Sequence, residues 1–429
     1  MEALMDSFTA TWFLSSYRHI RMVDTRIEAV DMSVSRRVSS LPVNPQRVLI
    51  AKAEELSRRG VKVYNYTAGQ PGLPPDTEAL NYFIEMLRRD PFKHFRYVST
   101  QGLPELRTAI SEDLRKYGGV DVEPSNILVT TGGADGLVLS IYTLLDEGDT
   151  LLLLDPSYSV YWDLARLAGL RVETCRQLYE NGFNPDPECI KDKLGSSAKA
   201  ILLASPDNPT SRVINSEVAK TIVDVAYERK AWIIYDVAYK HLVYEGEHVW
   251  FEKLAPSMDR LVVVGSFSKD IAIPGGRLGY VYGPSNAIAE MTKLKGVLGI
   301  VAPVPMQWMA YYYLSGGFKE KYLREVIPVY RRRRDAAYEA LKKNLPRARV
   351  LKPAASMYLF PDMAHYIREK GLDDVGFTMK LIEEKGVAML PGSIFGESGS
   401  NHLRITFVTM DEKNLVEGIE LLAEFVGEK

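Results

Sequence analysis

The residues that could do chemistry in this 429-residue sequence follow short apolar segments, each of which is predicted to be a buried strand. Lys269 ends the stretch Ser-Phe-Ser-Lys, Asp236 follows Ile-Ile-Tyr, and Tyr239 lies three residues further on. An aspartate at the end of a buried strand costs stability unless it has a partner, either a neighbouring arginine or a cationic ring nitrogen. A single lysine in such a place is most simply an exposed loop residue, so neither residue alone indicates a function.

A glycine-rich turn, Gly132-Gly133-Ala134, follows another apolar segment and opens a helical pattern. Backbone amides at such a helix start favour a phosphate group, although a tight strand-to-helix turn explains the glycines equally well. The turn is not GxGxxG, so a dinucleotide site is weakly supported. Further polar or aromatic residues at strand ends are Ser266, Arg277, Asn208 and Tyr158.

Ligands of open α/β sheets lie beyond the carboxyl ends of the strands, so we expect these residues to meet there. A lysine, an aspartate, a tyrosine, an asparagine, an arginine and a glycine-rich helix start fit one kind of ligand. That ligand is a planar aldehyde cofactor with a phosphate tail and a pyridine nitrogen. The ring of Tyr158 could stack on it.

From about residue 121, continuous apolar segments alternate with amphipathic helical patterns. This alternation predicts an α/β fold, with a mostly parallel sheet flanked by helices on both faces. Ser216 is a plausible N-cap for one of the helices. After residue 318 a long helix, two strand-like stretches and a closing helix predict a smaller α+β domain. The predicted strands are 127–131, 150–154, 200–204, 233–235, 261–264, 356–360 and 403–408.

These patterns predict a large cofactor-binding domain at 75–315 and a small C-terminal domain at 316–429, which the segment 32–74 joins. Residues 1–31 show no clean period. They are either a true N-terminal extension or the result of a start placed too far upstream, and we favour the second. The uncharged stretch 296–318 is long enough for a membrane span, but its glycines and prolines favour a loop followed by a buried helix.

The composition is that of an ordinary globular protein, with 46% hydrophobic and 25% charged residues, which excludes wholesale disorder. A net charge of −2 provides no global attraction to nucleic acid or an anionic membrane. Six histidines without an HExxH motif predict no metal centre. Two cysteines are too few for a disulfide framework, which predicts a reducing, cytoplasmic location. The basic run 331–334 predicts a solvated helix face.

Over about residues 32–429 the sequence resembles the class I, fold type I aminotransferases that depend on pyridoxal phosphate, of which aspartate aminotransferase is the example. Nine motifs occur in the order of that family, and nine in order are very unlikely by chance. They are Gly69-Gln-Pro71, Tyr97-Val-Ser-Thr-Gln-Gly102, Thr131-Gly-Gly, Asp155-Pro-Ser-Tyr158, Asn208-Pro-Thr210, Asp236-Val-Ala-Tyr239, Ser266-Phe-Ser-Lys269 with Arg277, Pro391-Gly-Ser-Ile-Phe395 and Leu403-Arg404. Two positions depart from the family, because Ser211 and Ala355 stand where glycine is usual.

The resemblance implies roles for the matching residues. Lys269 would bind the cofactor covalently and move a proton, Asp236 would hold the pyridine nitrogen protonated, and Tyr239 with Asn208 would bond the phenolic oxygen. Tyr158 would stack on the ring. The phosphate would bind Gly133, Ala134, Ser266 and Arg277, together with Tyr97 from a second subunit, which implies a homodimer. Arg404, with the backbone of Gly69, would bind the substrate carboxylate. Structurally, Gly69 and Gly392 could be turn glycines, and Tyr97 a core or interface aromatic.

The sequence therefore predicts an aminotransferase of amino acid metabolism. It would move an amino group from an L-amino acid to a 2-oxo acid by a ping-pong route. A β-lyase or synthase on the same cofactor is the main alternative, because the core motifs are shared. A non-catalytic sensor is disfavoured, since residues 1–31 are too few for a DNA-binding domain. A nicotinamide dehydrogenase would rest on the glycine turn alone. The donor and acceptor remain open.

Overall fold

The computed structural model describes residues 34–43 and 45–428. The chain divides into two units, Met1–Leu41 and Pro42–Lys429. The described part of the first unit contains one short helix, α2 (Arg36–Ser39). The predicted N-terminal extension, residues 1–31, lies outside the described residues. Within the described residues, no helix combines the length and the apolar character that crossing a membrane would need.

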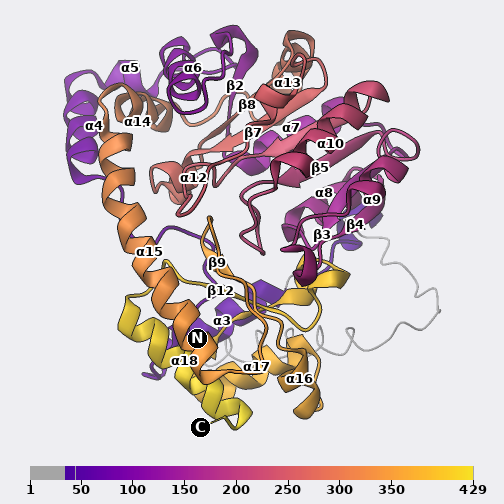
Figure 1. Cartoon of the computed structure of the whole chain (residues 1–429). Coiled ribbons are helices and arrows are strands. Elements are labelled where there is room, and N and C mark those ends of the chain that lie inside the picture. The colour runs from indigo at the N-terminus through magenta and orange to yellow at the C-terminus, as the bar shows by residue number, and fades with distance from the viewer. Residues whose placement is uncertain (1–33, 44, 429) are drawn as a thin grey trace. The chain divides into compact units, whose positions relative to one another are not determined.

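The second unit is built on a seven-stranded sheet (Figure 1). All neighbours pair in parallel except where β8 pairs in antiparallel fashion with β2 and β7. The predicted α/β fold with a mostly parallel sheet is therefore confirmed. In spatial order the strands are β2 (Ile127–Thr130), β8 (Gly279–Tyr282), β7 (Leu261–Ser266), β6 (Trp232–Asp236), β5 (Ala200–Ala204), β3 (Thr150–Asp155) and β4 (Arg171–Arg176).

Both faces of this sheet are covered, which explains why its strands are continuous apolar runs rather than alternating ones. Leu151 and Leu153 of β3 belong to one core with helices α7 (Gly133–Leu144), α8 (Ser159–Leu167) and α13 (Ser285–Leu298). Leu152 and Leu154 belong to the other core, with helices α6 (Pro104–Gly118), α9 (Pro187–Lys193) and α10 (Ser216–Glu228). Helix α10 begins at Ser216, but its cap is the side chain of Asn215, which accepts from Val218 N at 2.7 Å.

The uncharged stretch 296–318 begins with the last residues of α13 and continues as a loop followed by helix α14 (Val304–Ser315), so the predicted loop and helix are confirmed. Helix α15 (Phe318–Asn344) then runs from the region of α14 to the C-terminal helix α18 (Glu412–Val426), on which it packs (Figure 1). A three-stranded antiparallel sheet stands beside them, in the order β11 (Leu390–Pro391), β12 (Leu403–Thr406) and β9 (Tyr358–Leu359).

The remaining elements complete the two layers around these sheets. Helix α3 (Pro45–Arg58) packs near β10 and β11, and β1 pairs in parallel with β10. Further helices and two short strands connect the elements described above. They are β1 (Tyr64–Asn65), α4 (Thr77–Arg89), α5 (Pro91–Phe95), α11 (Phe251–Leu254), α12 (Phe267–Asp270), α16 (Ala364–Glu369), α17 (Asp374–Lys385) and β10 (Val387–Ala388).

The basic run 331–334 is not simply a solvated helix face, and the prediction is wrong for Arg334. This side chain is 1% exposed; its Nη2 lies 2.8 Å from Glu245 Oε1, and its Nη1 donates to the Pro353 carbonyl at 2.8 Å. The last of four consecutive arginines faces inward because a helix turns by about 100° per residue. Arg334 thus fastens α15 to the loop before β9.

The two cysteines pair, which removes the argument for a reducing compartment. Cys175 of β4 and Cys189 of α9 form a disulfide that closes a loop with a sequence separation of 14. The prediction treated two cysteines as too few for a disulfide framework, but a single bridge needs only that their Cα atoms lie close, here at 5.9 Å.

Reduction of this disulfide is expected to lower the unfolding free energy by up to about 3 kcal/mol, the scale for a loop of this length. Thermal unfolding with and without a reductant measures the effect. The double variant Cys175→Ala/Cys189→Ala is the control, and its unfolding should not respond to reductant. An equal response of both proteins would contradict the prediction.

Candidate active site

A cavity of about 590 Å³ opens at the carboxyl ends of the central strands. It is lined by residues of the large sheet, of α3, of the segment 65–70 and of the small sheet. The cavity brings together every predicted site residue except Tyr97. These are Gly69, Gly133, Ala134, Tyr158, Asn208, Asp236, Tyr239, Ser266, Lys269, Arg277 and Arg404.

Asp236 ends β6 inside the protein. Its Oδ1 accepts from the amide of Ala238 at 3.0 Å, and its Oδ2 accepts from the hydroxyl of Tyr161 at 2.8 Å. Burial raises the pKa of Asp236. Among the described residues no arginine or lysine forms an ion pair with it, so the neighbouring arginine considered from the sequence is not its partner. A protonated ring nitrogen in the cavity would supply the missing cation.

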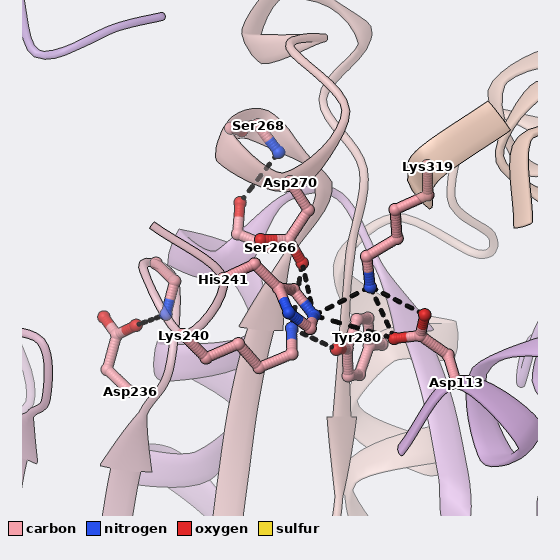
Figure 2. Close-up of polar contacts among 10 residues, drawn as sticks. Asp113, Asp236, Lys240, His241, Ser266, Ser268, Asp270, Tyr280 and Lys319 are labelled. Atoms are coloured by element: carbon pink, nitrogen blue, oxygen red, sulfur yellow. Dashed lines mark hydrogen bonds and ion pairs between the residues drawn. The ribbon is translucent and has the colours of Figure 1, made fainter. Parts of the chain in front are cut away.

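Lys269 lies in the short helix α12, directly after β7. Ser266 caps this helix by accepting from the amide of Ser268 at 3.2 Å (Figure 2). The ammonium group of Lys269 donates to the Gly69 carbonyl. Burial, followed by the charges of Arg404 and Arg277, lowers the pKa of Lys269 to about 8. The free amine, which is the form that attacks an aldehyde, is therefore accessible near neutral pH.

The start of α7 forms a cradle for an anion. Gly132 has a φ of +84°, and a Cβ there would stand 2.8 Å from Nη2 of Arg277, so the guanidinium lies directly against the turn. Arg277 is held there by its Nη1, which donates to the Pro274 carbonyl at 3.1 Å. Helix amides, the Ser266 hydroxyl and one guanidinium at the same place are suited to a phosphate group.

Arg404 of β12 points its guanidinium into the cavity and is 2% exposed. Its Nη1 donates to Asn208 Oδ1 at 3.1 Å, and its Nη2 donates to the Thr67 carbonyl at 2.8 Å. Its Nε is buried and has no hydrogen-bond partner among the described residues. A buried guanidinium with a donor left over is suited to binding a carboxylate.

Several cavity residues were not predicted from the sequence. Tyr161 could have been found, because it lies three residues after Tyr158 and shares its helix face. Tyr358 lies in a predicted strand, but nothing in the sequence shows that its hydroxyl meets that of Tyr239. The remaining additions include Thr67 and the α3 residues Gln46, Ile50 and Glu54. No local pattern marks them.

Tyr97 does not reach the cavity of its own chain. It is 80% exposed, and Phe92 and Phe95 beside it are also exposed. An exposed aromatic is not a core residue, so one of the two structural readings of Tyr97 is wrong. The role of Tyr97 at a phosphate stays a prediction.

A buried charge cluster lies directly behind the site (Figure 2). Lys240 follows Tyr239 in sequence and Asp270 follows Lys269, and the two form an ion pair of 2.8 Å. Tyr280 also bonds Lys240, at 2.9 Å. Removing one partner of a buried ion pair costs several kcal/mol, so this contact fixes the chain on both sides of the cavity.

The cluster continues to the helices around the sheet. Lys319, in the first turn of α15, lies 2.6 Å from Asp113 of α6 and 2.7 Å from the Nε2 atom of His241. Burial, followed by the positive charge of Lys319, lowers the pKa of His241 to about 4. Burial alone would raise the pKa of Asp113. The charge of Lys319 and the hydrogen bond with His241 outweigh burial and hold this pKa well below its usual value.

The residues present fit the cofactor that the resemblance implies. Pyridoxal phosphate carries an aldehyde, a ring nitrogen and a phosphate, and the cavity offers a buried amine, a buried carboxylate without a cation and an anion cradle. The hydroxyl of Tyr239 is available to bond the phenolic oxygen of pyridoxal phosphate. The guanidinium of Arg404, whose hydrogen bonds to Asn208 and Thr67 use one N–H each of Nη1 and Nη2, has further N–H donors for a substrate carboxylate.

Several aminotransferases have similar sequences and structures. Residues 61–422 match the family described as aminotransferase class I and II. The aspartate aminotransferase of Pyrococcus horikoshii is 33% identical over 393 residues, which is 90% of this chain and 97% of that protein. The aspartate/prephenate aminotransferase of Thermus thermophilus is 32% identical and covers 92% of this chain and 99% of its own.

Solved structures give the same result. The aspartate aminotransferase of Thermus thermophilus with maleate superimposes with a TM-score of 0.84 at 30% identity, over 91% of this chain and 99% of that chain. The aromatic aminotransferase of Pyrococcus horikoshii gives a TM-score of 0.80 at 27% identity, over 89% and 99%. The likeness spans both sheets, since it covers nine-tenths of this chain.

The low pKa of His241 predicts a loss of stability in acid. The unfolded chain takes up this proton near pH 6.5, whereas the folded protein takes it up only near pH 4. The contribution is therefore complete above pH 6.5 and is lost as the pH falls towards 4. Its size is about 3 kcal/mol. Denaturant unfolding between pH 7 and 4 should show a shallower dependence in His241→Gln.

The matched control is His365→Gln, because the side chain of His365 is 41% exposed. A slope reduced equally in His365→Gln would show that the effect does not come from His241. Burial also lowers the pKa of His248, so His241→Gln should reduce the slope without abolishing it. Identical slopes in the parent and His241→Gln would contradict the assignment.

Proposed function

The chain belongs to the class I and II aminotransferases, and we propose that it transfers amino groups between an L-amino acid and a 2-oxo acid with pyridoxal phosphate bound at Lys269. The observation that carries this proposal is the pairing of a buried, neutralisable lysine with a buried carboxylate that lacks a cation, in one cavity with an anion cradle. Bound pyridoxal phosphate supplies an aldehyde carbon and an electron-withdrawing ring.

The residues of this chain then have distinct tasks. Lys269 would hold the cofactor through its neutral amine, and as a free amine it would move a proton at the substrate Cα. Asp236 would keep the ring nitrogen protonated. Tyr239 and Asn208 would bond the phenolic oxygen, and Tyr158 would stack on the ring. Gly133, Ala134, Ser266 and Arg277 would hold the phosphate.

Substrate binding belongs to Arg404 and the backbone of Gly69. The first and last parts of the chain, 32–74 and 316–429, would form the smaller domain that closes over substrate, while 75–315 would hold the cofactor. Arg404 lies in the small sheet and Lys269 beside the large one, so a substrate that binds both would draw the two parts together.

A homodimer is the assembly that this site favours. Tyr97, Phe92 and Phe95 are exposed, as are Val297 near the end of α13 and Ile300 in the loop between α13 and α14. Large apolar side chains gathered on a surface are typical of a protein interface. In a second copy, Tyr97 would reach the phosphate bound by Arg277.

A cytoplasmic location stays a prediction, and the disulfide gives it no support.

A half-reaction tests the proposal. The protein is loaded with pyridoxal phosphate, and single amino acids are added without an acceptor while absorbance and mass spectrometry are followed. Formation of pyridoxamine phosphate with one equivalent of the matching 2-oxo acid is expected, and it would identify the donor. Catalytic release of ammonia would instead indicate a β-lyase.

Lys269→Ala is the matched variant in this experiment. It should lose both turnover and the absorbance of the lysine-bound cofactor, because among the described residues that line the cavity Lys269 is the only lysine. Circular dichroism verifies that the variant is folded. Normal turnover in Lys269→Ala would contradict the role of Lys269.

Arg404→Lys should weaken binding of the amino acid carboxylate by about 2–5 kcal/mol, since the substitution keeps a charge but removes the bidentate fork. Single-turnover kinetics over a range of donor concentrations measure this change. Phosphate binding lies elsewhere, so the cofactor content should remain that of the parent protein. A loss of cofactor equal to the loss of substrate affinity would contradict the separation of the two sites.

A further inference from the structure

Two tyrosine hydroxyls meet inside the cavity. The hydroxyl of Tyr358 lies 2.7 Å from the hydroxyl of Tyr239, and their rings pack edge to face with centroids 5.9 Å apart. Both side chains are buried, Tyr358 fully and Tyr239 to 7% exposure. Neither the motifs nor the matching families assign a task to Tyr358.

Tyr358 is held in place by two backbone contacts and one contact of its ring. Its amide donates to the hydroxyl of Ser211 at 3.1 Å, and the residue pairs with Thr406 across the small sheet. Its ring lies beneath the guanidinium of Arg404, with Cζ 4.4 Å from the ring centroid. A side chain fixed in this way presents its hydroxyl in one direction, towards Tyr239.

We propose that Tyr358 is a positioning residue that donates its hydroxyl proton to Tyr239 and so strengthens the bond from Tyr239 to the phenolic oxygen of the cofactor. The inference rests on the proposed function. A phenol has one proton, so if Tyr239 donates to the cofactor it must accept at its other side. Tyr358 is the donor placed there. Hydrogen bonds in such a chain polarise one another.

The surroundings keep both phenols protonated. Burial raises the pKa of Tyr239 well above its usual value, and burial also raises that of Tyr358, although Arg404 opposes it. The other titratable or charged groups that act on the pair are Tyr158 and Asp207, and the ammonium of Lys269 lies 5.8 Å from the ring centroid of Tyr239. Two neutral phenols can therefore form a directed chain at physiological pH.

This arrangement has a spectroscopic consequence. When lysine-bound cofactor loses the proton on its nitrogen, the phenolic oxygen no longer shares that proton and carries its full negative charge. A stronger donor at this oxygen favours the deprotonated form and lowers the pH midpoint of the change. Loss of the Tyr358 hydroxyl should therefore raise the midpoint by about 0.3 to 1 pH unit, the scale of one hydrogen bond.

The experiment is a pH titration of the absorbance of the lysine-bound cofactor in the full-length, cofactor-loaded protein. Four proteins form a cycle: the parent, Tyr358→Phe, Tyr239→Phe and the double variant. Tyr358→Phe should raise the midpoint in the parent and leave it unchanged in the Tyr239→Phe background. Tyr313→Phe is the control, since Tyr313 is a buried tyrosine that does not line the cavity and whose hydroxyl accepts from the Asp76 amide at 2.8 Å.

The outcomes separate this inference from a packing role. A change confined to thermal stability, with the midpoint unmoved, would overturn it. An equal shift in the Tyr239→Phe background, or the same shift in Tyr313→Phe, would also overturn it, because the effect would not pass through Tyr239. If the parent protein shows no lysine-bound absorbance at all, the proposed function fails, and this inference fails with it.

Discussion

The buried carboxylate of Asp236 is the constraint on which the site depends. It ends a strand that is covered on both faces, and its hydrogen bonds come from an amide and a phenol rather than from a cation. Such a group raises the free energy of the folded protein until a cation meets it. The rest of the fold must therefore be stable enough to hold this carboxylate in place, and the two large apolar cores on either side of the sheet provide that stability.

The buried charge cluster behind the site restrains Lys269 and Tyr239. Lys269 and Tyr239 each lie three residues beyond the end of a strand, Lys269 in the short helix α12 and Tyr239 in a turn. Such connecting segments are the parts of a sheet protein least restrained by backbone pairing. The ion pair of Lys240 with Asp270 joins the residues directly after them. Because Lys319 extends the cluster to the first turn of α15, the same contacts hold the helix that leads to the small sheet. The chemistry is thus fixed by charges that never face the cavity.

Sequence reasoning found what depends on local pattern and missed what depends on meeting in space. The strands of the large sheet were predictable, because burial on both faces makes each of them a continuous apolar run, as in Ala200–Ala204. The site residues were predictable because strand ends of one sheet share an edge and the motifs keep their order. The disulfide, the inward turn of Arg334 and the contact of Tyr358 with Tyr239 join segments far apart in the chain. No periodicity encodes such contacts.

One departure from the family pattern also makes a contact between segments that lie far apart in the chain. Ser211 stands where the family usually has glycine, and it takes the left-handed conformation with a φ of +57° that glycine would adopt at lower cost. Its hydroxyl accepts from the amide of Tyr358, so the added side chain has a use that glycine could not serve. In the segment before β9, Ser356 rather than Ala355 has a positive φ, of +62°, two residues before Tyr358. Two strained backbone positions therefore frame the one cavity tyrosine whose hydroxyl reaches Tyr239, and a strained conformation persists only where its surroundings hold it. The Ser211 substitution, which weakens the match to the family, and the placement of Tyr358 are parts of one local arrangement.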